Sequence, residues 1–427
     1  MTRYFLFILA FFAYHLLCSQ SGKINQLLIQ LASDGGDSSR VIHLNQLCQA
    51  YRVVGDYNAS LAYGKQALQL ARELSYKTGM ANAYCNIANT FCMRSNYPEA
   101  IKNNMACMQL RIELGDKKGI AETHHNLGAI YDKQGEYALA LQSYTASLAI
   151  DDEIEDWRNA IITCNNIGVI HERRGDYSMA ISSYFLALKK VNGTSIHDME
   201  SNFNVHQNIG NVYLHQGKYE EALKQYLASL DFEKKRGNKQ GIADSYNNLG
   251  VVYCSLGKYH LALRNHYSSL ELKEKIGDKQ GMAVSLINTA NVYKGQKLYT
   301  KALDLQYQAL SVYKAIGDKH GICVSYVLLG GTQSLLNKPD DAERFLNNAM
   351  TLNTEMQNIE LNMEIYRAFA TLNNILSGRR GQSLKNKEAK MMKAIGYYKL
   401  WLSSLENTTD KGKLTGSSVD LESVQSE

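Results

Sequence analysis

The chain has 427 residues and carries 46 Lys and Arg against 41 Asp and Glu, which gives a net charge of +5 at neutral pH. This surplus is too small for a nucleic-acid scaffold, and charges of both signs are mixed along the chain rather than gathered in a basic patch. Only two prolines are present, Pro98 and Pro339, and such scarcity is typical of a chain that is helical almost throughout.

Residues 1–20 have the features of a secretory signal peptide. Arg3 precedes an apolar run from Tyr4 to Leu17, and small polar residues follow. The run is shorter than the roughly 20 residues of a membrane-spanning helix, which favours a signal peptide over a membrane anchor. We therefore expect an exported protein, periplasmic or secreted, whose mature chain begins between Ser19 and Gly22.

The cleavage context leaves an alternative open. Leu17, Cys18 and Gln20 fit a cleavage site imperfectly, so the segment is alternatively an uncleaved anchor that holds the protein at a membrane. Cys18 also permits a lipoprotein interpretation, which the preceding leucines disfavour because a small residue is expected there. After this segment, the amphipathic pattern that starts at Lys23 predicts an N-terminal capping helix over residues 21–40.

A small residue then recurs about every 40 residues in the same local context, with one longer step between Gly168 and Gly210. These markers are Ala88, Gly128, Gly168, Gly210, Gly250, Ala290 and Gly330. If the marker is position 8 of a repeat, an aromatic residue follows at position 11, often a glycine at 15, a tyrosine at 17 and an alanine at 20. Such a period predicts an array of repeated units rather than a globular enzyme domain.

Each repeat is predicted to be a pair of helices. Positions 8 and 20 are small because the two helices cross there, and a glycine at 15 suits a helix C-terminus that needs a left-handed residue. Twelve residues before the marker stands a residue whose side chain can accept a hydrogen bond from a free N–H of the helix start. These N-caps are Asp116, Asp156, Asp198, Asn238, Asp278, Asp318 and Asn358, and only Tyr76 breaks the pattern.

The stretch from Asn247 to Leu263 and its counterparts at 126–141 and 208–223 resemble the tetratricopeptide repeat. The resemblance covers residues 41–355. It implies an all-α fold, a right-handed superhelical α-solenoid of about eight helix pairs with degraded terminal units. The common repeat has about 34 residues, so these repeats have longer helices, and turns such as Gly277 to Gly281 replace the usual closing proline.

Beyond residue 355 the repeat pattern decays, as expected for a terminal repeat. Ala370 holds position 8 of a degraded C-terminal helical unit over residues 356–406, which a basic insertion from Gly378 to Lys387 interrupts. Residues 407–427 are rich in Ser, Thr, Asp and Gly without an apolar period, so we expect a disordered tail.

No motif of the sequence predicts catalysis or a metal site. The cysteines beyond residue 20 are odd in number and lack C-x-x-C spacing, so we interpret them as small core residues rather than a disulfide framework. They are Cys48, Cys85, Cys92, Cys107, Cys164, Cys254 and Cys323. No H-E-x-x-H pair, phosphate loop or nucleophile elbow is present, which favours a non-enzymatic protein with no cofactor and no metal.

Position 6 is asparagine in six successive repeats: Asn86, Asn126, Asn166, Asn208, Asn248 and Asn288. The helical period places this position on a stripe opposite the packing stripe of positions 4, 7, 8 and 11. Asparagine inside a helix costs roughly 0.6 kcal/mol relative to alanine, so six of them need a cause. We predict a peptide-binding ladder, in which the amides donate to and accept from the main chain of an extended peptide.

This row looks like the asparagine ladders of the tetratricopeptide superhelices in kinesin light chain, spindle-orientation adaptors and the O-linked N-acetylglucosamine transferase. The resemblance implies that the matching asparagines hold a peptide here. An alternative stays open, in which the amides bond to neighbouring helices and only stabilise the stack. Both roles are compatible, because an amide has capacity beyond one intramolecular bond.

The sequence therefore predicts an exported, non-enzymatic protein–protein interaction scaffold that binds an extended peptide or partner segment, without nucleic acid. The chain also resembles the periplasmic sensory tetratricopeptide part of bacterial signalling proteins. The alternative is thus a sensory module, truncated or acting through a separate membrane-bound signalling partner. A structural homo-oligomer would need apolar stripes on the outer faces of the second helices, which Lys224, Lys235 and Lys275 disfavour.

Overall fold

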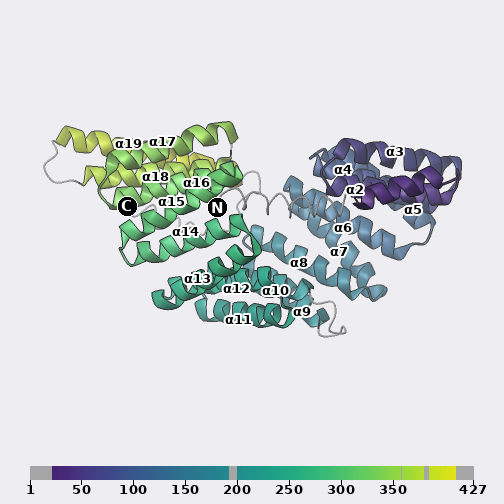
Figure 1. Ribbon diagram of the computed structural model, residues 1–427, viewed down its shortest axis with the longest axis horizontal. Coiled ribbons are helices and arrows are strands. Elements are labelled where there is room, and N and C mark those ends of the chain that lie inside the picture. Colours follow the sequence, from purple (N-terminus) through teal and green to yellow (C-terminus); the bar gives the residue numbers. More distant parts are fainter. Residues whose placement is uncertain (1–21, 192–199, 357, 379–383, 410–427) are drawn as a thin grey trace. The chain divides into compact units, whose positions relative to one another are not determined.

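The computed structural model describes residues 22–191, 200–356, 358–378 and 384–409 (Figure 1). The regular elements of these residues are helices, so the prediction of an all-α fold is confirmed. The predicted signal peptide, residues 1–20, lies outside the described residues, as do residues 410–427 of the predicted tail. The predicted N-cap Asp198 lies outside them too.

The chain divides into two compact bodies, and each is described by itself. Among the described residues, the N-terminal body comprises residues 22–171, 178–191 and 200–201, and the C-terminal body comprises the others. The first contains a helix over residues 22–33, then α2 (Ser38–Val53), α3 (Tyr57–Glu73), α4 (Lys77–Met93), α5 (Tyr97–Glu113), α6 (Lys117–Gln134), α7 (Tyr137–Glu153), α8 (Trp157–Arg173) and α9 (Tyr177–Val191). The second contains α10 (Glu200–His215), α11 (Tyr219–Arg236), α12 (Lys239–Ser255), α13 (Tyr259–Ile276), α14 (Lys279–Gly295), α15 (Tyr299–Ile316), α16 (Lys319–Leu335), α17 (Pro339–Met356), α18 (Ile359–Ser377) and α19 (Leu384–Thr409).

The helices pair in the order of the chain. An even-numbered helix packs against the odd-numbered helix that follows it, as α4 packs against α5 and α12 against α13, and each such pair is one repeat. The even-numbered helices, called first helices below, also contact one another. Helix α4 contacts α2 and α6 in the N-terminal body, and α12 contacts α14 in the C-terminal body. Each body therefore presents a face built from first helices, which we call the first-helix face.

The small residue at position 8 lets the two helices of a repeat approach closely. A Cβ atom added to Gly250 would lie 2.5 Å from the ring of His266 on the second helix. In the first repeat the sizes are exchanged, because Cys48 holds position 8 and a Cβ atom added to Gly64 would lie 3.0 Å from its sulfur. A small residue on one helix thus meets a larger residue on the other, as close packing requires.

The local signals at the helix ends are confirmed where the structure describes them. A side-chain oxygen accepts a hydrogen bond from the backbone N–H three residues later at Asp116, Asp156, Asn238, Asp278, Asp318 and Asn358. Tyr76, the predicted exception, makes no such bond. The position-15 glycines have a left-handed backbone, for example a φ of +80° at Gly135 and +70° at Gly257.

The N-terminal boundary differs from the prediction. The capping helix expected over residues 21–40 ends at residue 33, because the Asp37 side chain caps the start of α2. The first repeat consequently begins at residue 38 rather than at 41. The capping helix still covers the end of the array, since Leu27 is buried against Leu47 of α2.

The C-terminal boundary differs as well. Helices α18 and α19 pack together over the range predicted for a degraded unit, residues 356–406. The basic insertion is shorter than predicted, because α19 already begins at Leu384 and its leucine and lysines are good helix formers. This helix continues to Thr409, so the first residues of the predicted tail are helical.

Candidate binding groove on the first-helix face

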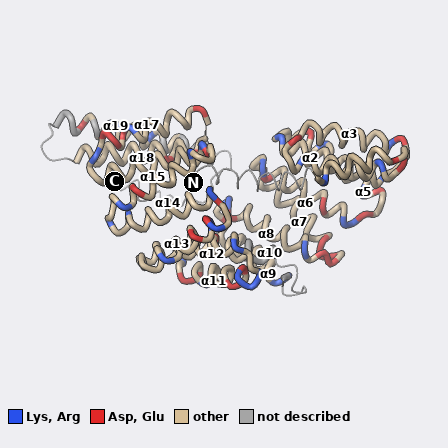
Figure 2. The backbone as a smooth tube through the Cα atoms, in the orientation of Figure 1, with Lys and Arg blue, Asp and Glu red and all other residues tan. Residues whose placement is uncertain are grey.

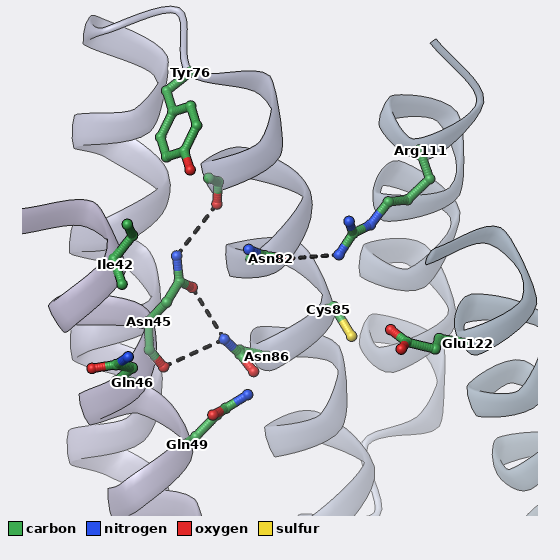
Figure 3. Close-up of a pocket in the computed structure, with 11 residues that line it drawn as sticks. Ile42, Asn45, Gln46, Gln49, Tyr76, Asn82, Cys85, Asn86, Arg111 and Glu122 are labelled. Atoms are coloured by element: carbon green, nitrogen blue, oxygen red, sulfur yellow. Dashed lines mark hydrogen bonds between the residues drawn. The ribbon is translucent and has the colours of Figure 1, made fainter. Parts of the chain in front are cut away.

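The first-helix face of the N-terminal body contains a groove of about 280 Å³ (Figure 3). Its walls come from α2, α4 and α6 and from the end of α5. Amides and charged side chains dominate the lining, which consists of Ile42, Asn45, Gln46, Gln49, Tyr76, Gly79, Asn82, Cys85, Asn86, Arg111 and Glu122. The groove therefore follows the polar stripe of the first helices and includes Asn86 of the predicted ladder.

Asn86 is held in a directional hydrogen-bond network (Figure 3). Asn45 donates from Nδ2 to the carbonyl oxygens of Val41 and Gly79, which leaves its Oδ1 as an acceptor. Asn86 donates from Nδ2 to this Oδ1 at 3.1 Å and to the Asn45 carbonyl oxygen at 3.4 Å. The donor side of Asn86 is thus committed to the preceding repeat, and its Oδ1 can only accept a further bond.

Three other ladder asparagines also direct Nδ2 to position 5 of the preceding repeat. The pairs are Asn288 with Asn247 at 2.9 Å, Asn166 with the His125 ring at 3.4 Å, and Asn126 with the Cys85 sulfur at 3.5 Å. These bonds correspond to the alternative that the sequence left open, in which the amides tie neighbouring helices together. They use the donor side of each amide, and peptide binding by the acceptor side stays a prediction.

The remaining two ladder residues differ from each other. Asn208 is half-buried and has an interaction partner within the protein. Asn248 is also half-buried, but no hydrogen bond joins its side chain to another described residue. The whole amide of Asn248 is therefore available to a ligand, and of the six ladder residues Asn248 contributes least to holding neighbouring helices together.

Two histidines make hydrogen bonds with asparagines of this face in their neutral form. Desolvation lowers the pKa of His125, and it lowers the pKa of His266 to about 4. A neutral His266 donates from Nδ1 to the Oδ1 of Asn247 at 3.3 Å, and the same oxygen accepts from Asn288. The ring that fills the space over Gly250 is thereby connected to the ladder through one shared acceptor.

Arg111 reaches the groove from α5 and was not among the residues predicted from the sequence. Its guanidinium donates to Oδ1 of Asn82 at 2.6 Å and pairs with the carboxylate of Asp116. The side chain fits because the next repeat has Gly119 beside it, where a Cβ atom would lie 2.5 Å from Cδ of Arg111. The second glycine of a G-D-K-x-G turn, here Gly119, leaves room for a large side chain from the preceding helix, and this glycine is the sequence signal for Arg111.

The groove offers hydrogen-bonding groups rather than an electrostatic potential of a single sign. Charged residues of both signs occur along the helices of each body (Figure 2), and the groove itself contains both Arg111 and Glu122. Among the described residues, no group of three or more His, Cys, Asp or Glu side chains could hold a metal ion. No described helix is both long and apolar enough to cross a membrane.

Comparison with known protein families identifies the repeats. The family described as Tetratricopeptide repeat matches residues 39–113, 79–153, 119–189, 202–275 and 281–355, which together make up more than half of the chain. The chain belongs to the tetratricopeptide repeat family. The resemblance inferred from the spacing of small and aromatic residues is thus confirmed, whereas no curated protein matches the chain.

Solved structures share this tetratricopeptide repeat fold. The apo form of RapI matches with a TM-score of 0.61 and 15% identity over 88% of this chain and 99% of that one. The apo form of the quorum sensor NprR from B. thuringiensis matches with a TM-score of 0.58 and 18% identity over 79% and 94%. A Rap protein complexed with Competence and Sporulation Factor matches with a TM-score of 0.53 and 11% identity over 88% and 100%. At these identities the similarity establishes the fold alone.

Proposed function

We propose that this tetratricopeptide repeat protein is an exported, non-enzymatic scaffold whose first-helix face binds an extended segment of a partner protein. The observation that carries the proposal is the row of position-6 amides, whose donor side is committed to the stack at Asn86 and Asn288. Their Oδ1 atoms remain as acceptors. An extended main chain presents N–H donors at regular intervals and is therefore a ligand that suits such a row.

The spacing of the row suits the same ligand. Neighbouring helices lie about 8–10 Å apart, and an extended chain rises about 3.3 Å per residue. One acceptor then meets roughly every third residue of the bound segment. Next to Asn86, the exposed amides of Gln46 and Gln49 supply donors for its carbonyl groups.

A sensory module is the second candidate function. Two of the structural neighbours are described as a quorum sensor and as a Rap protein complexed with Competence and Sporulation Factor. In this candidate, a ligand in the groove changes the affinity of the protein for a separate membrane-bound partner. Cross-linking in the cell envelope with and without ligand distinguishes the two functions, because a simple scaffold holds its partners equally in both conditions.

Asn248 and Asn288 provide a matched test of the binding role. A peptide ligand is first selected from a random peptide library against the full chain, and its affinity is measured for Asn248→Ala. We expect binding to weaken by roughly 0.5–1.5 kcal/mol, as for one neutral hydrogen bond. The melting temperature should stay unchanged or rise slightly, because alanine is the better helix former.

Asn288→Ala and Lys224→Ala are the controls. Asn288→Ala should lower the melting temperature, because Oδ1 of Asn247 loses its 2.9 Å donor. Lys224→Ala, on the exposed side of a second helix, should change neither stability nor affinity. If Asn248→Ala binds the peptide with unchanged affinity, the position-6 asparagines do not take part in peptide binding.

Export is the part of the proposal that rests on residues 1–20. N-terminal sequencing of the protein from its own host should show a mature chain that begins between Ser19 and Gly22. Recovery of the intact Met1 form from the cytoplasm would contradict export while leaving the binding role untouched.

A further inference from the structure

Cys85 and Cys107 occupy facing positions of the α4–α5 repeat. Within a repeat, the residue at position 8 meets the residue sixteen places later, as Gly250 meets His266. Because the two helices run antiparallel, moving three residues outward on each helix brings position 5 opposite position 27. Cys85 holds position 5 and Cys107 holds position 27 of the same repeat.

The two thiols interact and differ in acidity. Hydrogen bonding with Cys107, together with burial, raises the pKa of Cys85 well above its usual value. The same hydrogen bond lowers the pKa of Cys107 to about 6, aided by Thr123, whose Oγ1 lies 3.6 Å away, and by the charge of Arg111. The pair therefore holds one proton near neutral pH and contains one thiolate.

The two thiols also differ in access. Cys107 is only 1% exposed, whereas Cys85 is half-buried and lines the groove (Figure 3). Two amides stand beside the Cys85 sulfur, with Nδ2 of Asn126 at 3.5 Å and Nδ2 of Asn89 at 3.7 Å. A small molecule in the groove consequently reaches Cys85 directly and Cys107 only through Cys85.

We propose that Cys85 and Cys107 are a reactive dithiol in the groove wall that is reversibly oxidised by low-molecular-weight disulfides. The Cys107 thiolate takes the proton of Cys85 as the Cys85 sulfur attacks one sulfur of the small disulfide, so a mixed disulfide forms on Cys85 and one thiolate leaves. Cys107 then attacks the Cys85 sulfur, and its proton passes to the second departing sulfur. The single proton of the pair leaves on one of the released thiols and solvent protonates the other, so the two protein sulfurs become one disulfide and the small disulfide becomes two thiols.

The other cysteines lack this combination of a facing thiol and a stabilised thiolate. All seven described cysteines are free. Burial raises the pKa of Cys164 to about 12 and that of Cys323 to about 11, and it also raises the pKa of Cys254. These thiols have no neighbouring thiolate to accept their proton and therefore react slowly at neutral pH, so they serve as internal controls.

The site is tested on the full chain in a neutral buffer of reduced and oxidised glutathione. After an acid quench, free thiols are alkylated and the peptides are mapped by mass spectrometry. We expect Cys85 linked to Cys107, Cys254 alkylated, and full reversal by dithiothreitol. A pair that remains alkylated under conditions that oxidise a reference dithiol protein, or a mixed disulfide that stays on wild-type Cys85, would overturn the proposal.

Single variants and an arsenical separate the two chemical steps. Cys107→Ser should stop at the mixed disulfide on Cys85, and Cys85→Ser should leave Cys107 unmodified. Phenylarsine oxide, which bridges closely spaced thiols, should protect both cysteines of the wild-type chain at one equivalent and lose this selectivity in urea. Equal protection of Cys254, or selectivity that persists in urea, would show that the fold does not create the site.

Discussion

Replacing Gly250 by alanine should destabilise the C-terminal body, although alanine is the better helix former. The added Cβ atom would lie 2.5 to 2.7 Å from three atoms of the His266 ring, which is 1% exposed. Ordinary carbon contacts are about 3.5–4.0 Å, so the ring or the helix must move by about 1 Å. Overpacking of this kind costs about 1–3 kcal/mol, whereas the higher helix propensity of alanine over glycine stabilises the helix by about 1 kcal/mol. We expect a net loss of about 1 kcal/mol.

Gly331→Ala is the matched control for this substitution. A Cβ atom at Gly331, also inside a helix of the C-terminal body, would have nothing within 4 Å, so it should gain about 0.5–1 kcal/mol. Urea unfolding followed by circular dichroism compares the two variants with the wild-type chain. Adding His266→Gln should restore part of the loss, because an unbranched side chain can move away from the added Cβ atom more easily than the His266 ring can. If both alanine variants gain stability equally, the register of the crossing is wrong.

Three further predictions concern the buried residues and a helix cap of the same body. The pKa of His266 is lowered from 6.5 to about 4 in the folded chain, so the unfolded chain binds the proton first as the pH falls. The free energy of unfolding of the wild-type chain should therefore fall by up to about 3 kcal/mol between about pH 6.5 and pH 4. His266→Gln should reduce this pH dependence, measured by urea unfolding at several pH values. Gln306→Met should stabilise the protein by about 1–3 kcal/mol, measured by urea unfolding, because both polar atoms of this 1% exposed side chain lack a partner among the described residues. Asp318→Ala should cost about 0.5–2 kcal/mol in the same assay through loss of the 2.9 Å cap bond to Gly321, whereas Asp318→Asn should cost little.

The helix pairs were predictable because their signals are local. A cap residue lies three places from the N–H that it satisfies, as in Asp278, and a left-handed glycine such as Gly135 marks a helix end by itself. The small residue at position 8 also fixes the crossing, because any Cβ atom at Gly250 would meet a ring. The shifted ends of the capping helix and α19 reflect caps and propensities that the repeat spacing does not contain.

The groove was predictable only in outline, because its details join different repeats. Asn86 donates to Asn45, 41 residues away, so the direction of the amide depends on how neighbouring first helices stack. Arg111 enters the groove from a second helix, through the space that Gly119 leaves open. The spacing of Cys85 and Cys107 became informative only once the antiparallel pairing of α4 and α5 was established.

Photo-cross-linking can show whether an extended chain lies along the first helices. A library-selected peptide carries a photoreactive residue at successive positions, and its cross-links to the full chain are mapped by mass spectrometry. We expect adducts near Asn86, Asn126 and Asn166 on consecutive first helices, advancing one repeat for about every three peptide residues. Adducts on the second helices, or on a single repeat whatever the position of the label, would contradict it.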